Sequence, residues 1–165
     1  MAKFAALTTG VFILLAGPIL VLYIGALLAD FPAGTASVDA GLALVGAVFF
    51  AVVLSGFALV IASLTPRRGF GIAAIITVLT LSYTIVSALQ GIFGEGFGDE
   101  RLAGWIGLFS PITLVDGVQV WAFGVESSAV FGPPAGGGLV FLLIMFVFVA
   151  ACYAAMFARY RKVKL

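Results

Sequence analysis

Leu64-Thr65-Pro66-Arg67-Arg68-Gly69 is a short basic turn between two apolar runs, each long enough to cross a bilayer. Pro66 does not continue a helix comfortably and disfavours the helical conformation of Thr65, so the first of these runs ends here. Arginine is costly at the centre of a bilayer, which places the turn in water or among headgroups. Because loops rich in Lys and Arg stay in the cytoplasm, this turn also orients every other segment of the chain.

The composition agrees with a membrane protein. Of 165 residues, 64% are hydrophobic and 9% are charged, whereas about a quarter of the residues of a soluble domain are charged. There is no histidine, and the single cysteine, Cys152, lies in an apolar run. These counts predict an all-α polytopic membrane protein with one transmembrane domain over residues 1–165.

Four apolar runs are expected to span the bilayer, at about 4–29, 40–64, 70–93 and 139–158. At about 1.5 Å per residue the first run exceeds the roughly 30 Å hydrocarbon core, so we expect it to tilt or to bend at Gly17-Pro18.

The first half of the chain contains a lysine before its first apolar run and an acidic segment after it. Lys3 before the first run also fits a cleavable signal peptide, but the run is far longer than the apolar region of about 7–15 residues that such peptides have, which favours a span. Residues 30–39 are expected to form a short acidic loop between the first two spans.

Small and polar side chains recur at helical spacing within the spans. The second run has a stripe of small residues from Ala43 to Ala62, which lets another helix approach closely. The third run carries Thr77, Thr80, Thr84 and Ser87, with Gln90 beside them. One interpretation is a polar seam that faces a pathway or a partner subunit. The other is that each hydroxyl bonds to the carbonyl four residues earlier while the small face packs.

Residues 94–138 form the longest part between spans. Within it, 102–109 and 112–123 are apolar but too short to cross the membrane. Ser110-Pro111 between them is typical of an N-cap followed by the first helical position. We expect two short helices over about 102–123, which lie in the outer interface or dip into the membrane and return.

Aromatic residues accompany these short helices. Trp105 and Trp121 are typical of the membrane–water interface. Four phenylalanines on the same side form either a lipid-facing groove or scattered interfacial contacts. They are Phe97, Phe109, Phe123 and Phe131.

Once the spans are placed, the charges are strongly asymmetric. One side holds the bases Lys3, Arg67, Arg68, Arg159, Arg161, Lys162 and Lys164, and the other holds Arg101 with all seven acids: Asp30, Asp39, Glu95, Asp99, Glu100, Asp116 and Glu126. The positive-inside rule then predicts that both termini are cytoplasmic. The basic tail either binds anionic lipid or only anchors the end of the last span.

Several function classes lack the residues that they need. Without histidine there is no His-based zinc or haem site and no Ser–His dyad. No ionisable residue lies within a predicted span, which disfavours a proton-coupled pump, and no Gly-rich phosphate loop with its lysine is present. We therefore expect no catalytic, cofactor-binding or metal site, no ATP hydrolysis by this chain and no nucleic-acid partner.

Four stretches taken together resemble the membrane subunit of bacterial ABC transporters of the type-2 exporter permease class, particularly those of actinobacteria. They are Ala2–Leu7, Ser63–Gly71, Gly107–Gly117 and Arg159–Val163. Two short helical pieces before a last span with a basic tail also look like the outer re-entrant region of that family.

The resemblance implies a multi-pass protein of the bacterial inner membrane. Two permease halves, identical or different, would form a translocation pathway that a separate cytoplasmic ATPase dimer opens and closes. By position, Thr65, Pro66, Arg67, Arg68 and Gly69 form the candidate ATPase-facing inner loop. The candidate pathway or dimer seam comprises Thr77, Thr80, Thr84, Ser87 and Gln90.

Permeases of this class have six spans, so the four spans here would correspond to the third through sixth. The chain would then be a partial subunit, either a truncated reading frame or one whose missing part sits on another chain. A stand-alone four-span scaffold or assembly protein without an ATPase is the alternative, and a membrane enzyme is less favoured. An uncharged pathway suits lipids, drugs or peptides and does not choose among them.

Overall fold

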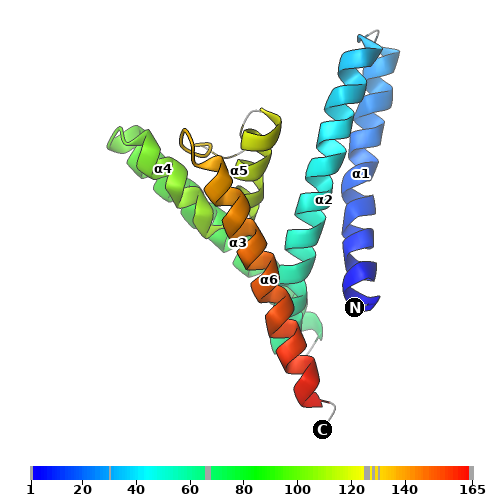
Figure 1. Ribbon diagram of the computed structural model, residues 1–165, viewed down its shortest axis with the longest axis vertical. Coiled ribbons are helices and arrows are strands. Elements are labelled where there is room, and N and C mark those ends of the chain that lie inside the picture. Colours follow the sequence, from blue (N-terminus) through cyan, green and yellow to red (C-terminus); the bar gives the residue numbers. More distant parts are fainter. Residues whose placement is uncertain are drawn as a thin grey trace. The chain divides into compact units, whose positions relative to one another are not determined.

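The computed structural model describes residues 2–29, 31–65, 68–124, 127, 129 and 131–163, with the backbone alone at 2, 3, 68 and 160–163. All regular structure in these residues is helical (Figure 1). Four helices are long and apolar enough to cross a membrane: α1 (Ala2–Leu28), α2 (Ala33–Leu64), α3 (Arg68–Gly91) and α6 (Gly138–Val163). The chain is a four-span helical membrane protein, as its apolar runs predict.

Short helical elements connect α3 to α6. They are a π-helical turn η1 (Ile92–Gly96), α4 (Glu100–Ile106), a 3₁₀ turn η2 (Gly107–Phe109) and α5 (Pro111–Phe123). The prediction of short helices between the third and fourth spans is confirmed. Helices are the natural solution here as well, because backbone groups near lipid must find their partners within the protein.

The chain forms two compact units, Met1–Ser55 and Gly56–Leu165, and α2 contributes to both. In the first unit α1 continues through Pro18 as one helix, although a proline has no N–H to donate to the preceding turn. The bend expected at Gly17-Pro18 stays a prediction. Most large apolar side chains of α1 are exposed, as expected of a helix that faces lipid.

Helix α2 begins at Ala33, several residues before the predicted start at 40. The expected acidic loop is therefore helical from Ala33 onward, and Asp30 lies outside the described residues. The carbonyl of Pro32 accepts the amide of Ala36 at 3.1 Å, and the Ser37 hydroxyl donates to the carbonyl of Gly34 at 2.9 Å. Polar residues that resemble a loop in sequence are thus accommodated in the first turns. With 32 residues, α2 is about 48 Å long and extends beyond the hydrocarbon core.

The second unit is built around α5. Helix α5 packs against α6, and α3 packs against both α4 and α5. The last part of α2 contacts α6 through the Phe57 and Phe148 rings, whose centroids are 5.8 Å apart. The buried apolar side chains of this unit include Val86, Ala103, Leu114, Val115, Val118, Phe141 and Met145. Figure 1 shows that the start of α3 and the end of α6 lie at one end of this unit, while α4 lies at the other.

Local sequence signals set the bounds of the short helices. The Asp99 carboxylate accepts the Leu102 amide at 2.9 Å and caps α4. Ser110 is the N-cap residue of α5, with Pro111 directly after it, as Ser110-Pro111 predicts. The Ser110 hydroxyl makes no capping hydrogen bond, so the fixed backbone of the proline is the stronger part of this signal. Gly124 ends α5 in the left-handed conformation, with φ of 65°.

Helices α5 and α6 approach each other closely at Gly117. A Cβ atom at Gly117 would lie 2.4 Å from Cδ1 of Phe141, a residue that is 1% exposed. The Phe141 ring is also stacked on Trp105, with centroids 6.2 Å apart. Because the ring has contacts on both sides, it cannot retreat from a larger residue at position 117.

We expect Gly117→Ala to destabilise the protein by about 1–3 kcal/mol through overpacking, measured as a lower Tm in mild detergent. Gly91→Ala is the matched control, because a Cβ at Gly91 meets nothing within 4 Å; it should leave the Tm unchanged or slightly raised. Adding Phe141→Leu to Gly117→Ala should recover part of the loss. Equal Tm values for Gly117→Ala and Gly91→Ala would contradict the packing argument.

Candidate functional site

The basic turn Leu64–Gly69 is only partly described. Pro66 and Arg67 lie outside the described residues, and α3 begins at Arg68. The Thr65 hydroxyl donates to the carbonyls of Ile61 and Ala62, at 3.0 and 3.3 Å, and so closes the end of α2. The same oxygen would lie 3.0 Å from a Cβ at Gly71. The end of α2 and the start of α3 therefore lie close together at Thr65 and Gly71. The assignment of this turn as an ATPase-facing loop stays a prediction.

The five residues of the predicted seam do not share one environment. Thr77, Thr80 and Thr84 are exposed on α3, Ser87 is half-buried and Gln90 is fully buried. The Thr84 hydroxyl donates to the carbonyl of Thr80 at 2.8 Å, which is the local hydrogen bond that the second interpretation of this stripe expects. The structure thus separates Gln90 from the threonines.

Gln90 connects three parts of the second unit. Its Nε2 donates to the carbonyl oxygens of Ala103 in α4 and Phe131 in the segment before α6, both at 3.1 Å. Because both partners are acceptors, the atom that faces them must be the amide nitrogen. Sequence reasoning placed Gln90 beside the stripe and missed this role. The available signal was that a glutamine in an apolar helix needs buried partners.

Polar groups also fix the chain on both sides of α5. The Thr113 hydroxyl donates to the carbonyls of Gly107 and Ser110 just before the helix. The carboxylate of Asp116, within α5, accepts hydrogen bonds from two residues that follow the helix: the Ser127 hydroxyl at 2.6 Å and the Ala129 amide at 3.4 Å. Asp116 is 7% exposed, and buried carboxylates are held by such hydrogen bonds. This cluster holds the segment after α5 against the helix.

Glycines allow the segment before α6 to approach the helices closely. A Cβ at Gly94 in η1 would clash with the Phe131 ring, and a Cβ at Gly104 in α4 would lie 2.8 Å from the carbonyl oxygen of Gly132. The start of α6 is equally tight, because a Cβ at Gly138 would overlap the Trp121 side chain. Residues 131–138 are thereby packed against η1, α4 and α5.

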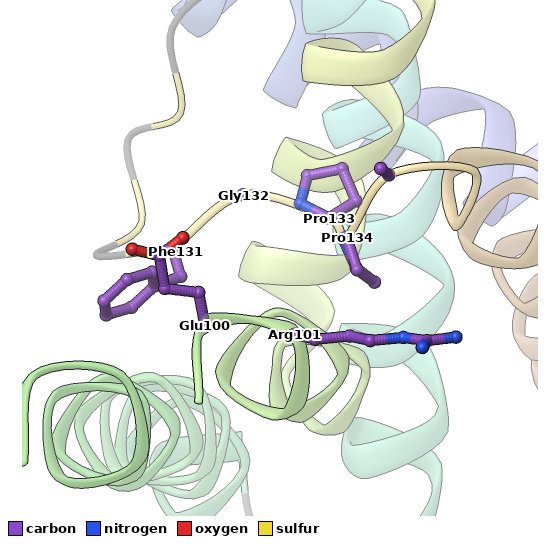
Figure 2. A pocket seen from close by; sticks show the side chains of 7 residues that line it. Glu100, Arg101, Phe131, Gly132, Pro133 and Pro134 are labelled. Atoms are coloured by element: carbon purple, nitrogen blue, oxygen red, sulfur yellow. The ribbon is translucent and has the colours of Figure 1, made fainter. Parts of the chain in front are cut away.

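An open pocket of about 630 Å³ lies between the start of α4 and the segment before α6. Glu100 and Arg101 of α4 form one wall, and residues 131–135 form the other. Figure 2 shows the Glu100 side chain reaching toward Phe131 and the Arg101 side chain running below Pro134. Of the four phenylalanines considered for a groove, Phe131 lines this pocket, whereas Phe97 and Phe109 are exposed to the surroundings.

The described residues contain no group of three or more Cys, Asp or Glu side chains that could hold a metal ion. Comparisons of the chain with models of protein families, with curated proteins and with solved structures give no match.

We expect Gln90→Leu to lower the free energy of unfolding by about 1–3 kcal/mol, because two carbonyl groups lose a buried donor. It should also speed chymotrypsin cleavage between Phe123 and Gly138, mapped by mass spectrometry in mild detergent. Thr84→Val is the control, since the Thr84 hydroxyl bonds only within its own helix. A cleavage rate for Gln90→Leu equal to that of the control would show that Gln90 does not hold this segment.

Proposed function

We propose that the chain is a partial permease subunit of an ATP-driven ABC exporter, which forms a translocation pathway with a second permease half and is driven by a separate ATPase. The observation that carries this proposal is the short helical pair, α4 and α5, between the last two spans, packed against α3 and α6. This arrangement agrees with the outer region that the sequence resemblance implies. In this proposal the basic turn and the basic tail face the cytoplasm.

The exposed surface of α3 supports the proposal that this chain is one subunit of a larger complex. Only 6% of its most apolar window is buried within the chain, so lipid or another subunit must cover the rest. Thr77 and Thr80 lie about 14 and 18 Å along the helix from Arg68, near the middle of a bilayer. Their hydroxyls are exposed and have no hydrogen-bond partner in the described part of the chain. A pathway or a second permease half would offer such partners, whereas lipid tails offer none.

The orientation of the chain follows from its charges. Arg68 at the start of α3 and Arg159 near the end of α6 belong to one end of the second unit, opposite α4 (Figure 1). The positive-inside rule assigns that end to the cytoplasm of a bacterial cell, together with both termini. The turn Thr65–Gly69 then lies on the side where an ATPase would bind.

Cysteine labelling tests this topology. In a Cys152→Ala background, Glu95→Cys should react with a membrane-impermeant maleimide on intact cells, because Glu95 is exposed in η1. Arg159→Cys, exposed in α6, should react only after the membrane is permeabilised. The Cys152→Ala protein provides the unlabelled control. The reverse pattern of labelling would contradict the proposed orientation.

The ATPase is tested by purifying the tagged chain from its native membrane in mild detergent and identifying accompanying proteins by mass spectrometry. We expect a stoichiometric P-loop ATPase, and its recovery should fall at least fivefold in Arg67→Glu/Arg68→Glu. The matched control, Arg159→Glu/Arg161→Glu, reverses the same number of charges in the tail and should keep the ATPase.

Charge reversal in the turn can also change the topology, so the labelling assay above should be repeated in both double variants. Recovery of the wild-type chain without any P-loop ATPase would refute the transporter proposal and favour the stand-alone scaffold. Equal loss of the ATPase in both double variants would contradict the assignment of the turn as its contact.

A further inference from the structure

We propose that the pocket formed by Glu100, Arg101 and residues 131–135 binds a phosphate–ammonium zwitterion, supplied in the membrane by the headgroup of a phosphatidylethanolamine lipid. This inference does not depend on an ATPase or on transport. It rests on the charges of the pocket, on the rigidity of its wall and on its position at the ends of two spans.

The pocket offers one charge of each sign. Glu100 and Arg101 are both exposed, and neither makes an ion pair within the described residues. Neighbouring positions on a helix point about 100° apart and do not face each other. Figure 2 shows these two side chains extending in different directions along the pocket. A ligand that carries both an anionic and a cationic group can therefore contact both side chains without bringing them together.

The opposite wall is held in place by its contacts with α3 and α4. Gln90 holds the carbonyl of Phe131, and Gly104 lies against Gly132 and Pro134. Pro133 and Pro134 have no N–H groups, and the carbonyl of Pro134 already accepts the amide of Gly137 at 2.7 Å. This wall contributes apolar contact, and the Phe131 ring beside Glu100 offers a surface on which an ammonium group is stabilised.

The position of the pocket identifies a lipid as the ligand. Glu100 follows the π-helical turn that ends α3, and Ala135 lies just before the start of α6. The pocket is thus at the level of the ends of two spans, where headgroups are found. Phe97 and Leu102 nearby are 73% and 43% exposed, and they provide apolar surface for acyl chains.

An anionic headgroup fits this site less well than a zwitterionic one. Arg101 is the single base that the predicted topology places on this side, whereas all seven acids lie there. Glu100 next to it would repel a second negative charge. Phosphatidylethanolamine places a phosphate for Arg101 and an ammonium for Glu100 in one headgroup, whereas phosphatidylglycerol has only the phosphate.

Native mass spectrometry of the full chain, purified in mild detergent and given equal amounts of the two lipids, tests the proposal. We expect at least fivefold more retained phosphatidylethanolamine than phosphatidylglycerol. Arg101→Gln should reduce retention of phosphatidylethanolamine at least fivefold. Glu100→Gln should bring the two lipids to similar retention, because the ammonium loses its partner and the repulsion of the anionic lipid is removed.

Glu95→Gln and Arg159→Gln are matched controls, since they remove one charge of each sign outside the pocket; the lipid ratio should not change. Unchanged helical content by circular dichroism establishes that the variants are folded. Displacement of the lipid by millimolar phosphoethanolamine would show that the site recognises the free zwitterion as well. Lack of displacement, with the variant pattern intact, assigns the site to the intact lipid. Equal retention of both lipids by the wild type, or unchanged ratios in both pocket variants, would overturn the proposal.

Discussion

The packing of the second unit depends on two hydrogen bonds that the buried side-chain amide of Gln90 donates. One nitrogen atom supplies hydrogen bonds to α4 and to the segment before α6, two parts of the chain that are far apart in sequence. In an apolar surrounding an unpaired carbonyl is costly, so the amide favours the one arrangement in which both acceptors are present. The end of α3, the start of α4 and the approach to α6 are thereby held together without any charged group.

The spans and the short helices could be predicted because the signals are local. Long uncharged runs define α1, α3 and α6, and Ser110-Pro111 marks the start of α5. The start of α2 could not be predicted, because Gly34, Thr35 and Ser37 have the composition of a loop and yet form helical turns. A helix that is longer than the hydrocarbon core is thick extends into water, so the hydrophobicity of its residues does not set where it begins.

The candidate sites were harder to predict, and the reason is also physical. Periodicity places Gln90 beside the stripe that contains Thr84, but it carries no information about which face of the helix another segment covers. The contacts of Gly94 with Phe131, and of Gly117 with Phe141, join residues far apart in the chain. They become visible only when the backbone is folded. The pocket arises in the same way, because its two walls come from residues 100–101 and 131–135.

The π-helical turn at the end of α3 has a consequence for how related chains would differ in length. In η1 the Phe97 amide donates to the carbonyl of Ile92, five residues earlier, so this turn holds one residue more than an α-helical turn. Loss of a single residue here would convert the π-helical turn to an α-helical turn that ends in nearly the same direction. The same loss in the regular part of α3 would instead rotate all the residues that follow by about 100°. A difference of one residue in length can therefore be absorbed within η1 while α4 and α5 keep their orientation.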